Sequence, residues 1–237
     1  MCLRQIYPDR AEVKSWFTQT LLPTETVYGI LDQAHEMGYR GRICFNYYNE
    51  PMLDKRLPAF GKYAMDLGFE LVMFASNGDY LDEAMAERLD GCFHSFNISP
   101  YENNTRIRRR ITRSWFQKTK VKFTTGMHFR VHDFSGDDPE LQDLQHRRCF
   151  NVARNAVVNH RGEFLACCQE MVPHFNLGSI YDTPLRELWE RKTDLISILT
   201  REDGRIQYPY CATCYRGSQK EYVEVIQKQP EVVNIEV

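Results

Sequence analysis

The first half of the chain alternates between two hydrophobic patterns. Four apolar residues recur at the i, i+3, i+4, i+7 spacing of a one-faced helix: Val27, Ile30, Leu31 and Ala34. Thr24 is the predicted N-cap of this helix, and Gly38 is its predicted C′ residue. Continuous apolar runs, typical of buried strands, separate such helices. The patterns predict helices at 24–37, 55–67, 81–89 and 105–118, and strands at 41–47, 69–75, 92–98 and 121–129.

This alternation of helix and strand is typical of parallel βαβ units. Right-handed crossovers curl four or more such strands into an open or partial barrel. We therefore expect an α/β fold in which residues 1–130 form a partial parallel (βα) barrel. In such folds the chemistry lies at the carboxyl ends of the strands. Polar residues follow the expected strands at 49–50, 76–77, 97–99 and 127–130.

The second half of the chain has a different organisation. Residues 131–148 lose the periodicity and include a turn-rich Asp-Phe-Ser-Gly-Asp-Asp-Pro segment, which predicts a linker. A small α+β module is expected at 149–217, with a hairpin across Gly162, a helix at 184–191, and a Cys-x-x-Cys clip. A C-terminal helix and tail are expected at 218–237.

Composition and charge exclude some classes of function. The chain has 237 residues and a formal net charge of −2, so no general attraction to nucleic acid or anionic membranes is expected. No apolar run approaches 18 residues, and the N-terminus lacks an apolar signal core. We therefore expect a cytoplasmic protein without a membrane span. The basic segment 105–120 is interpreted as a solvated amphipathic helix rather than an RNA-binding surface.

Cysteine is the residue type that suggests chemistry. Eight cysteines in a reducing compartment favour metal ligation over disulfides. Cys44 and Cys92 lie in apolar runs and are expected to be small core residues. The candidate ligands are Cys149, Cys167, Cys211 and Cys214. Such a set of soft thiolates selects zinc or an iron–sulfur cluster.

Two details near these ligands are left open by the residues alone. Cys168 is an alternative to its neighbour Cys167 as a ligand. Glu170 and His174 follow closely; we expect them to be ordinary surface residues, with a role in supporting the metal site or contacting substrate as the alternative. Tyr208 and Tyr210 flank the clip and are expected to shield the site from water.

The arrangement of these cysteines resembles the SPASM/twitch module of radical SAM enzymes. Four residues separate Gly162 from Cys167, as in that module. The segments Asn-Leu-Gly-Ser-Ile at 176–180 and Pro-Leu-Arg-Glu-Leu-Trp at 184–189 are also similar to it. There, four thiolates hold one auxiliary [4Fe–4S] cluster. The resemblance implies this cluster here, with structural zinc as the alternative.

The same resemblance implies that residues 1–130 are a radical SAM barrel that binds S-adenosylmethionine (SAM). Glu50 stands where the family has a Gly-Gly-Glu-Pro segment, and a carboxylate there accepts hydrogen bonds from the SAM ammonium. Tyr48 and Asn49 replace the two glycines, which is a departure from the family. The implied SAM-contacting residues are Asn49, Glu50, Ser76, Asn77, Asn97, Ser99 and Arg106.

The family's second [4Fe–4S] cluster, which binds SAM, depends on a three-cysteine loop after the first strand of the barrel. Only Cys2 corresponds to that loop here, and the first strand has no counterpart. We expect either a chain without its N-terminal segment or a degenerate homologue. One cysteine cannot hold a cubane, so the sequence as it stands is not expected to cleave SAM.

Two classes of function remain. The resemblance implies an enzyme that cleaves SAM to a 5′-deoxyadenosyl radical and oxidises or modifies a small-molecule or peptide substrate. Its electron donor would be a flavodoxin or ferredoxin. The alternative is a non-catalytic iron–sulfur or zinc module for binding or electron transfer. Nucleic acid is not expected as a partner in either case.

Overall fold

The computed structural model describes residues 9–16, 20–99, 111, 115–124, 144–214 and 232–236. These residues belong to two compact units. One unit contains the described residues of 21–127, together with 158–161 and 232–236. The other contains those of 9–20, 144–157 and 162–214. Most of the expected basic helix and linker lies outside the described residues.

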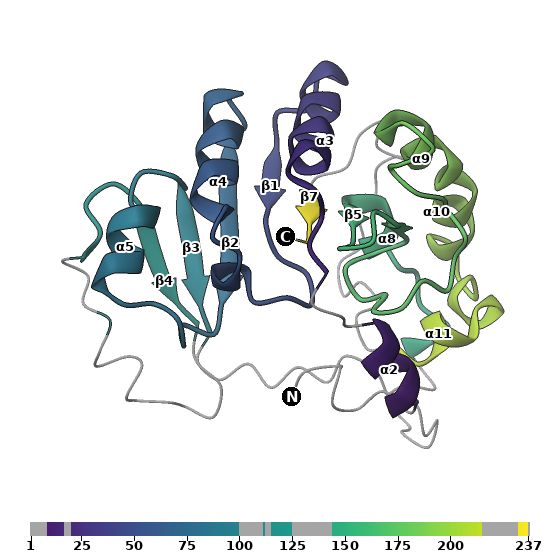
Figure 1. Ribbon diagram of the computed structural model, residues 1–237. Coiled ribbons are helices and arrows are strands. Elements are labelled where there is room, and N and C mark those ends of the chain that lie inside the picture. The colour runs from purple at the N-terminus through teal and green to yellow at the C-terminus, as the bar shows by residue number, and fades with distance from the viewer. Residues whose placement is uncertain are drawn as a thin grey trace. The chain divides into compact units, whose positions relative to one another are not determined.

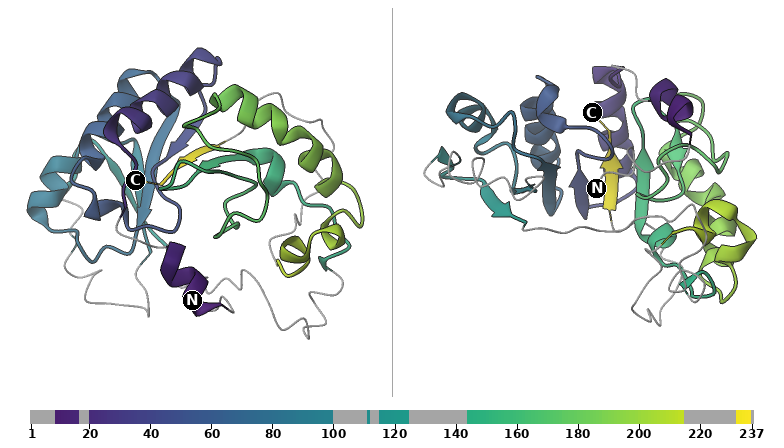
Figure 2. Two further views of the ribbon diagram at one scale, coloured as in Figure 1. Left: turned by 45° about the vertical axis from the view of Figure 1, so that its right-hand side comes forward. Right: turned by 90° about the horizontal axis from the view of Figure 1, so that it is seen from below.

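The first unit is a parallel sheet covered on one face by helices (Figures 1 and 2). Its strands follow the order β4-β3-β2-β1-β7, and each neighbouring pair is parallel. They are β1 (Arg42–Cys44), β2 (Leu71–Ser76), β3 (Ser95–Ile98), β4 (Lys120–Phe123) and β7 (Val232–Ile235). The helices are α3 (Thr24–Glu36), α4 (Leu57–Asp66) and α5 (Glu83–Leu89). The expected βα alternation is therefore confirmed.

Phenylalanines fill the space between this sheet and its helices. Phe45 follows β1 and stacks on Phe60 of α4, with ring centroids 6.3 Å apart. Phe74 of β2 stacks on Phe96 of β3 at 4.8 Å. Burial along β2 alternates with a period of two. The residue next to each buried aromatic on its strand therefore faces the opposite side of the sheet. That opposite face presents Ala75 and Asn97, which are paired in register.

Glycines follow two of the helices, and one of them, Gly38, is the C′ residue that the sequence predicts. Gly38 after α3 and Gly68 after α4 both adopt a φ of 79°, the left-handed conformation that glycine tolerates best. The predicted N-cap of α3 is wrong by one position. Pro23 is the capping residue, and its carbonyl accepts the amide of Val27 at 3.2 Å. Thr24 is the first helical residue, and its hydroxyl accepts a hydrogen bond from Arg56 Nη1 at 2.9 Å.

The C-terminal strand β7 corrects the expectation of a tail at 218–237. It pairs in parallel with β1, with Val232 opposite Arg42 and Asn234 opposite Cys44. Val233 and Ile235 are fully buried, as the helix-facing residues of a central strand should be. The strand lies on the side of β1 away from β2, which is where a first barrel strand would stand. The helix expected before it lies outside the described residues.

The second unit contains the expected hairpin and a set of short helices (Figure 2). Strand β5 (Asn155–Val158) leads through a turn to β6 (Phe164–Leu165). Gly162 in this turn has a φ of 75°, and a Cβ there would lie 2.4 Å from the Tyr181 ring. Its α-helices are α2 (Arg10–Trp16), α8 (Asn151–Arg154), α9 (Leu185–Arg191), α10 (Thr193–Leu199) and α11 (Pro209–Ala212). It also contains the 3-10 helix η4 (Arg205–Gln207), while η1 (Pro51–Leu53) belongs to the first unit. The predicted helix at 184–191 is confirmed.

Two further expectations can be compared with the described residues. The helix predicted at 105–118 does not extend through 116–118, because those residues form a bend before β4. Among the helices in the described part of the chain, none has the length and apolar character needed to cross a membrane.

Candidate iron–sulfur and cofactor sites

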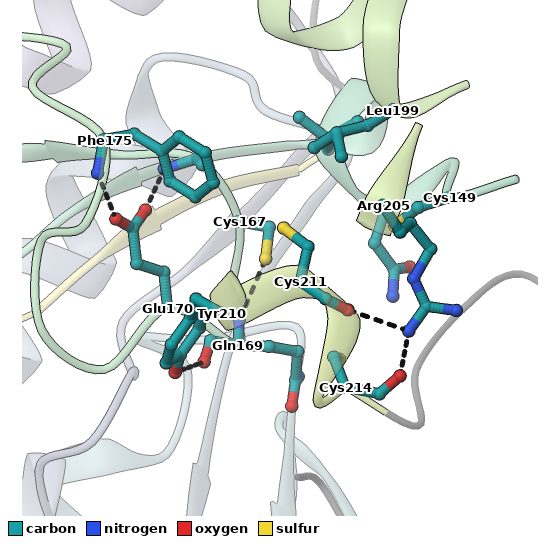
Figure 3. A pocket seen from close by; sticks show the side chains of 13 residues that line it. Cys149, Cys167, Gln169, Glu170, Phe175, Leu199, Arg205, Tyr210, Cys211 and Cys214 are labelled. Atoms are coloured by element: carbon teal, nitrogen blue, oxygen red, sulfur yellow. Dashed lines mark hydrogen bonds between the residues drawn. The ribbon is translucent and has the colours of Figure 1, made fainter. Parts of the chain in front are cut away.

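The four candidate cysteines come together around one pocket (Figure 3). Cys149 precedes α8, and Cys167 follows β6. Cys211 lies in α11, and Cys214 follows it, with its amide donating to the Cys211 carbonyl at 3.2 Å. Figure 3 shows the sulfurs of Cys167 and Cys211 turned toward each other.

The structure distinguishes the two adjacent cysteines. Cys167 lines the pocket with the other three, whereas Cys168 is not among the lining residues. The Cys167 sulfur accepts the amide of Gln169 at 3.4 Å, and the Cys168 sulfur accepts the Gln169 side-chain amide at 3.4 Å. This geometry supports Cys167, the cysteine at the Gly-x4-Cys spacing, as the ligand.

Burial and neighbouring cysteines favour the neutral form of two of these thiols. Burial raises the pKa of Cys167 well above its usual value, and neighbouring thiolates of Cys168, Cys149 and Cys214 raise it further. Burial also raises the pKa of Cys211, again with thiolate neighbours. Four thiolates this close are stable as anions only when a metal centre neutralises them.

The spacing of the cysteines bears on which metal centre fits. Within the described residues, no three His, Cys, Asp or Glu side chains are close enough to bind one ion. Zinc with bonds of about 2.3 Å would need sulfurs about 3.8 Å apart. The thiolates of a cubane lie farther apart, because each binds a different iron. Four sulfur donors of this kind suit a [4Fe–4S] cluster, with a single zinc ion as the alternative.

Arg205 holds the clip in place from inside the protein. Its side chain is only 1% exposed, and its Nη2 donates to the Cys211 carbonyl at 3.1 Å and to the Cys214 carbonyl. Its Nη1 donates to the carbonyl of Leu144. These bonds satisfy carbonyls at the end of α11 and fix both clip cysteines. Nothing in the local sequence pattern had singled out this arginine.

Glu170 is a second organiser of the site, and its expected surface role is wrong. Its side chain is fully buried and accepts three backbone amides, from Ala166 at 2.5 Å, His174 at 2.5 Å and Phe175 at 3.0 Å. Burial nevertheless raises its pKa to about 7. The carboxylate closes the loop that presents Cys167 to the pocket (Figure 3).

Tyr210 behaves as the sequence predicted, and it also supports that loop. Its ring is buried and lines the pocket. Its hydroxyl donates to the Gln169 carbonyl at 2.6 Å and accepts the Met171 amide at 3.1 Å. His174 packs against the ring, with centroids 4.0 Å apart. The aromatic wall excludes water from one side of the cysteines.

Three of the expected SAM-contacting residues meet at the carboxyl end of the parallel sheet. Glu50 caps η1, and its Oε1 accepts the Met52 amide at 3.3 Å. Its Oε2 accepts the Asn77 amide at 3.0 Å. Ser76 ends β2, and its hydroxyl accepts the Gly78 amide at 2.9 Å. Burial raises the pKa of Glu50, while these amides act in the opposite direction.

The other expected SAM-contacting residues are less close to this point. The Asn49 side chain accepts the amide of Tyr47 at 2.8 Å, which turns it back onto its own loop. Asn97 lies one strand farther along, opposite Ala75. Ser99 is exposed and donates its amide to the Ser76 carbonyl at 2.8 Å. Arg106, Cys2 and the strand end at 127–130 lie outside the described residues.

One polar residue at this edge was missed by the sequence reasoning. Asn46 follows β1, and its Oδ1 accepts the Ala75 amide at 3.1 Å and the Cys44 thiol at 2.8 Å. It therefore joins the ends of two neighbouring strands. Its place directly after an apolar run was the signal that could have identified it.

Comparison with known proteins supports both halves of this description. Residues 149–215 match SPASM, described as an iron-sulfur cluster-binding domain. The structure of BtrN in complex with AdoMet and 2-DOIA superimposes with a TM-score of 0.65 at 18% identity, covering 88% of this chain and 83% of that one. A structure of selenomethionine BtrN in an open conformation gives 0.62 at 19% identity, covering 86% of each chain.

A search of curated proteins found no match. At these identities the likeness to BtrN concerns the fold. The expected α/β fold with a parallel sheet is thereby confirmed. The SPASM match covers all four candidate cysteines. The chain thus combines a fold like that of BtrN with a segment that matches an iron–sulfur cluster-binding domain.

Proposed function

We propose that this chain is a radical SAM/SPASM-type protein whose Cys149, Cys167, Cys211 and Cys214 hold one auxiliary [4Fe–4S] cluster. The observation that carries this proposal is the convergence of those four thiols on one pocket inside the matched domain. When bound, the cluster supplies a one-electron acceptor for an oxidation. The chain's own contribution is to position and shield it, through Arg205, Glu170 and Tyr210.

The barrel unit is proposed to bind SAM at the carboxyl end of its sheet. Glu50 would accept hydrogen bonds from the SAM ammonium, a charge-assisted contact. Its two present partners, the amides of Met52 and Asn77, already hold the carboxylate at that edge. Ser76, Asn77 and Asn97 would offer polar groups nearby, and Asn49, Ser99 and Arg106 complete the proposed set.

The reaction we propose is oxidation of a small molecule. BtrN, which shares this fold, was crystallised with AdoMet and 2-DOIA, and this supports a small-molecule substrate over a peptide. A flavodoxin or ferredoxin is proposed as the electron donor. Radical generation would require a second cluster on a three-cysteine loop to which Cys2 belongs.

Anaerobic reconstitution with iron and sulfide tests the cluster assignment. The chain should take up about four irons and four sulfides at this site. Cys211→Ala should abolish this uptake, whereas Cys92→Ala should not, because Cys92 lies in the barrel unit. Stoichiometric zinc without sulfide would overturn the assignment.

A further inference from the structure

A fully buried lysine lies at the junction of two helices next to the cysteine site. Lys192 ends α9 and precedes α10, and its side chain has no exposed surface. Its Nζ donates to the Asn155 carbonyl at 2.5 Å. The ammonium also lies 5.0 Å from the Trp189 ring centroid and 5.7 Å from that of Phe164. Burying an ammonium group costs several kcal/mol of desolvation free energy, and one carbonyl and two aromatic rings do not offset that cost.

The anionic groups that face Lys192 are those of the cysteine site. Burial lowers the pKa of Lys192 to about 8, and four groups counteract that effect. The largest counteracting influence is the Cys167 thiolate, followed by Glu170, Cys168 and Cys149. Lys192 is not among the residues that line the pocket.

Arg205 supplies a second buried cation from another element. It lines the pocket, and its charge lowers the pKa of the Cys211 thiol against the larger effect of burial. Its guanidinium is held by the carbonyls of Cys211 and Cys214 (Figure 3). Lys192 thus lies over the ring of Phe164 in β6, the strand that leads to Cys167, and Arg205 binds the carbonyls of both clip cysteines.

We infer that Lys192 and Arg205 are charge-compensating positioning residues that raise the reduction potential of the cluster held by the four cysteines. This inference rests on the proposed auxiliary cluster. A thiolate-ligated cluster is anionic, and each added electron increases that negative charge. Buried cations in a medium of low dielectric constant stabilise the reduced state more than the oxidised state. The site is thereby adapted to accept an electron.

A purely structural role for Lys192 makes a different prediction. If Lys192 served only to donate a hydrogen bond to the Asn155 carbonyl, removing its positive charge would not change the cluster potential. Lys192→Gln tests this, because an amide can donate to that carbonyl without a positive charge. Lys192→Arg keeps the charge and changes the shape. Arg191→Gln is the matched control, since Arg191 is the preceding residue and pairs at the surface with Glu187 at 2.6 Å.

The experiment is a redox titration of the reconstituted protein followed by electron paramagnetic resonance. Lys192→Gln and Lys192→Met should shift the cluster potential to more negative values, while Lys192→Arg should stay close to wild type. Arg191→Gln should shift it far less, because water screens an exposed charge. Arg205→Lys should retain a wild-type-like potential but hold iron less firmly, since it loses the forked hydrogen bonds.

The iron content and the cluster potential of the Lys192 variants together decide whether the inference holds. Neutral Lys192 variants that load fully and keep the wild-type potential overturn the inference. If both neutral variants fail to load iron while Lys192→Arg loads, the charge serves cluster assembly rather than the potential, and the inference falls. If Lys192→Arg fails as they do, or loads with their lowered potential, shape rather than charge matters and the inference falls. A wild-type chain that takes up no iron and sulfide overturns the proposed function as well.

Discussion

Glu236 and His160 form a buried pair across 76 residues of sequence. One carboxylate oxygen, Glu236 Oε2, accepts both the His160 amide at 2.9 Å and the His160 ring Nδ1 at 2.8 Å. The two side chains are 4% and 8% exposed. Because an ionised carboxylate only accepts, the proton of this contact sits on Nδ1. The pair anchors the end of β7 to the turn that follows β5.

Glu236→Gln should therefore destabilise the barrel unit. The amide keeps one acceptor oxygen but loses the charge that strengthens both bonds, so a loss of about 1–3 kcal/mol is expected. Thermal unfolding followed by circular dichroism measures it. Glu87→Gln, a matched change at an exposed position of α5, should leave the midpoint unchanged. Equal midpoints for both variants would show that the pair does not anchor the strand.

Asp90 gives the barrel unit a predictable dependence on pH. Burial acts to raise the pKa of this carboxyl, but the amides of Lys118, Thr119 and Gln117, at 2.9, 2.8 and 3.1 Å, outweigh it and hold the pKa below its usual value. The folded state therefore favours the charged form. The stability this provides is complete above the unfolded-state pKa and is lost as the pH falls through the lower folded-state pKa.

Asp90→Asn should remove that contribution. The expected cost at neutral pH is about 1 kcal/mol, at the low end for a charged acceptor because the group is largely solvated. Urea unfolding at neutral pH and near pH 3 measures it. The difference between wild type and variant should shrink at the acidic pH. A difference that stays constant across this range would contradict the assigned hydrogen bonds.

Glu50 should control the affinity for SAM and its dependence on pH. Glu50→Gln removes a charged acceptor for the ammonium and should weaken binding by about 10- to 100-fold. Because burial raises the pKa of Glu50, affinity in the wild type should fall as acid protonates the carboxyl, at a higher pH than for an exposed glutamate. Isothermal titration calorimetry with SAM measures both effects.

Glu36→Gln, at an exposed position of α3, is the control for that titration and should bind SAM like the wild type. Unchanged affinity in Glu50→Gln would remove this carboxylate from the proposed SAM site.

Adjacent cysteines allow a sharp test of ligand choice. Cys167→Ser should lose the cluster, because serine replaces a pocket-lining thiol, whereas Cys168→Ser should retain it. Iron and sulfide content and the visible absorption of the reconstituted proteins measure this. The reverse pattern would move the ligand to Cys168 and refute the Gly-x4-Cys reading.

The sequence by itself determined the elements that depend on local patterns. Helical periodicity before Gly38 and Gly68 marked two helices and their ends, because glycine tolerates the left-handed conformation that closes them. The type and spacing of the cysteines indicated a thiolate metal site, because that chemistry depends on residue type. The polar residues after each strand located the edge at which Glu50, Ser76 and Asn77 meet.

Only the tertiary structure decided the features that depend on contacts between distant residues. Four residues of β7 carry too little pattern to predict a strand, and they form one because β1 offers an edge and the helices bury Val233 and Ile235. Lys192, Arg205 and Glu170 look like surface residues in the sequence. Packing removes them from water and brings their charges to the cysteines, and burial is what makes those charges matter.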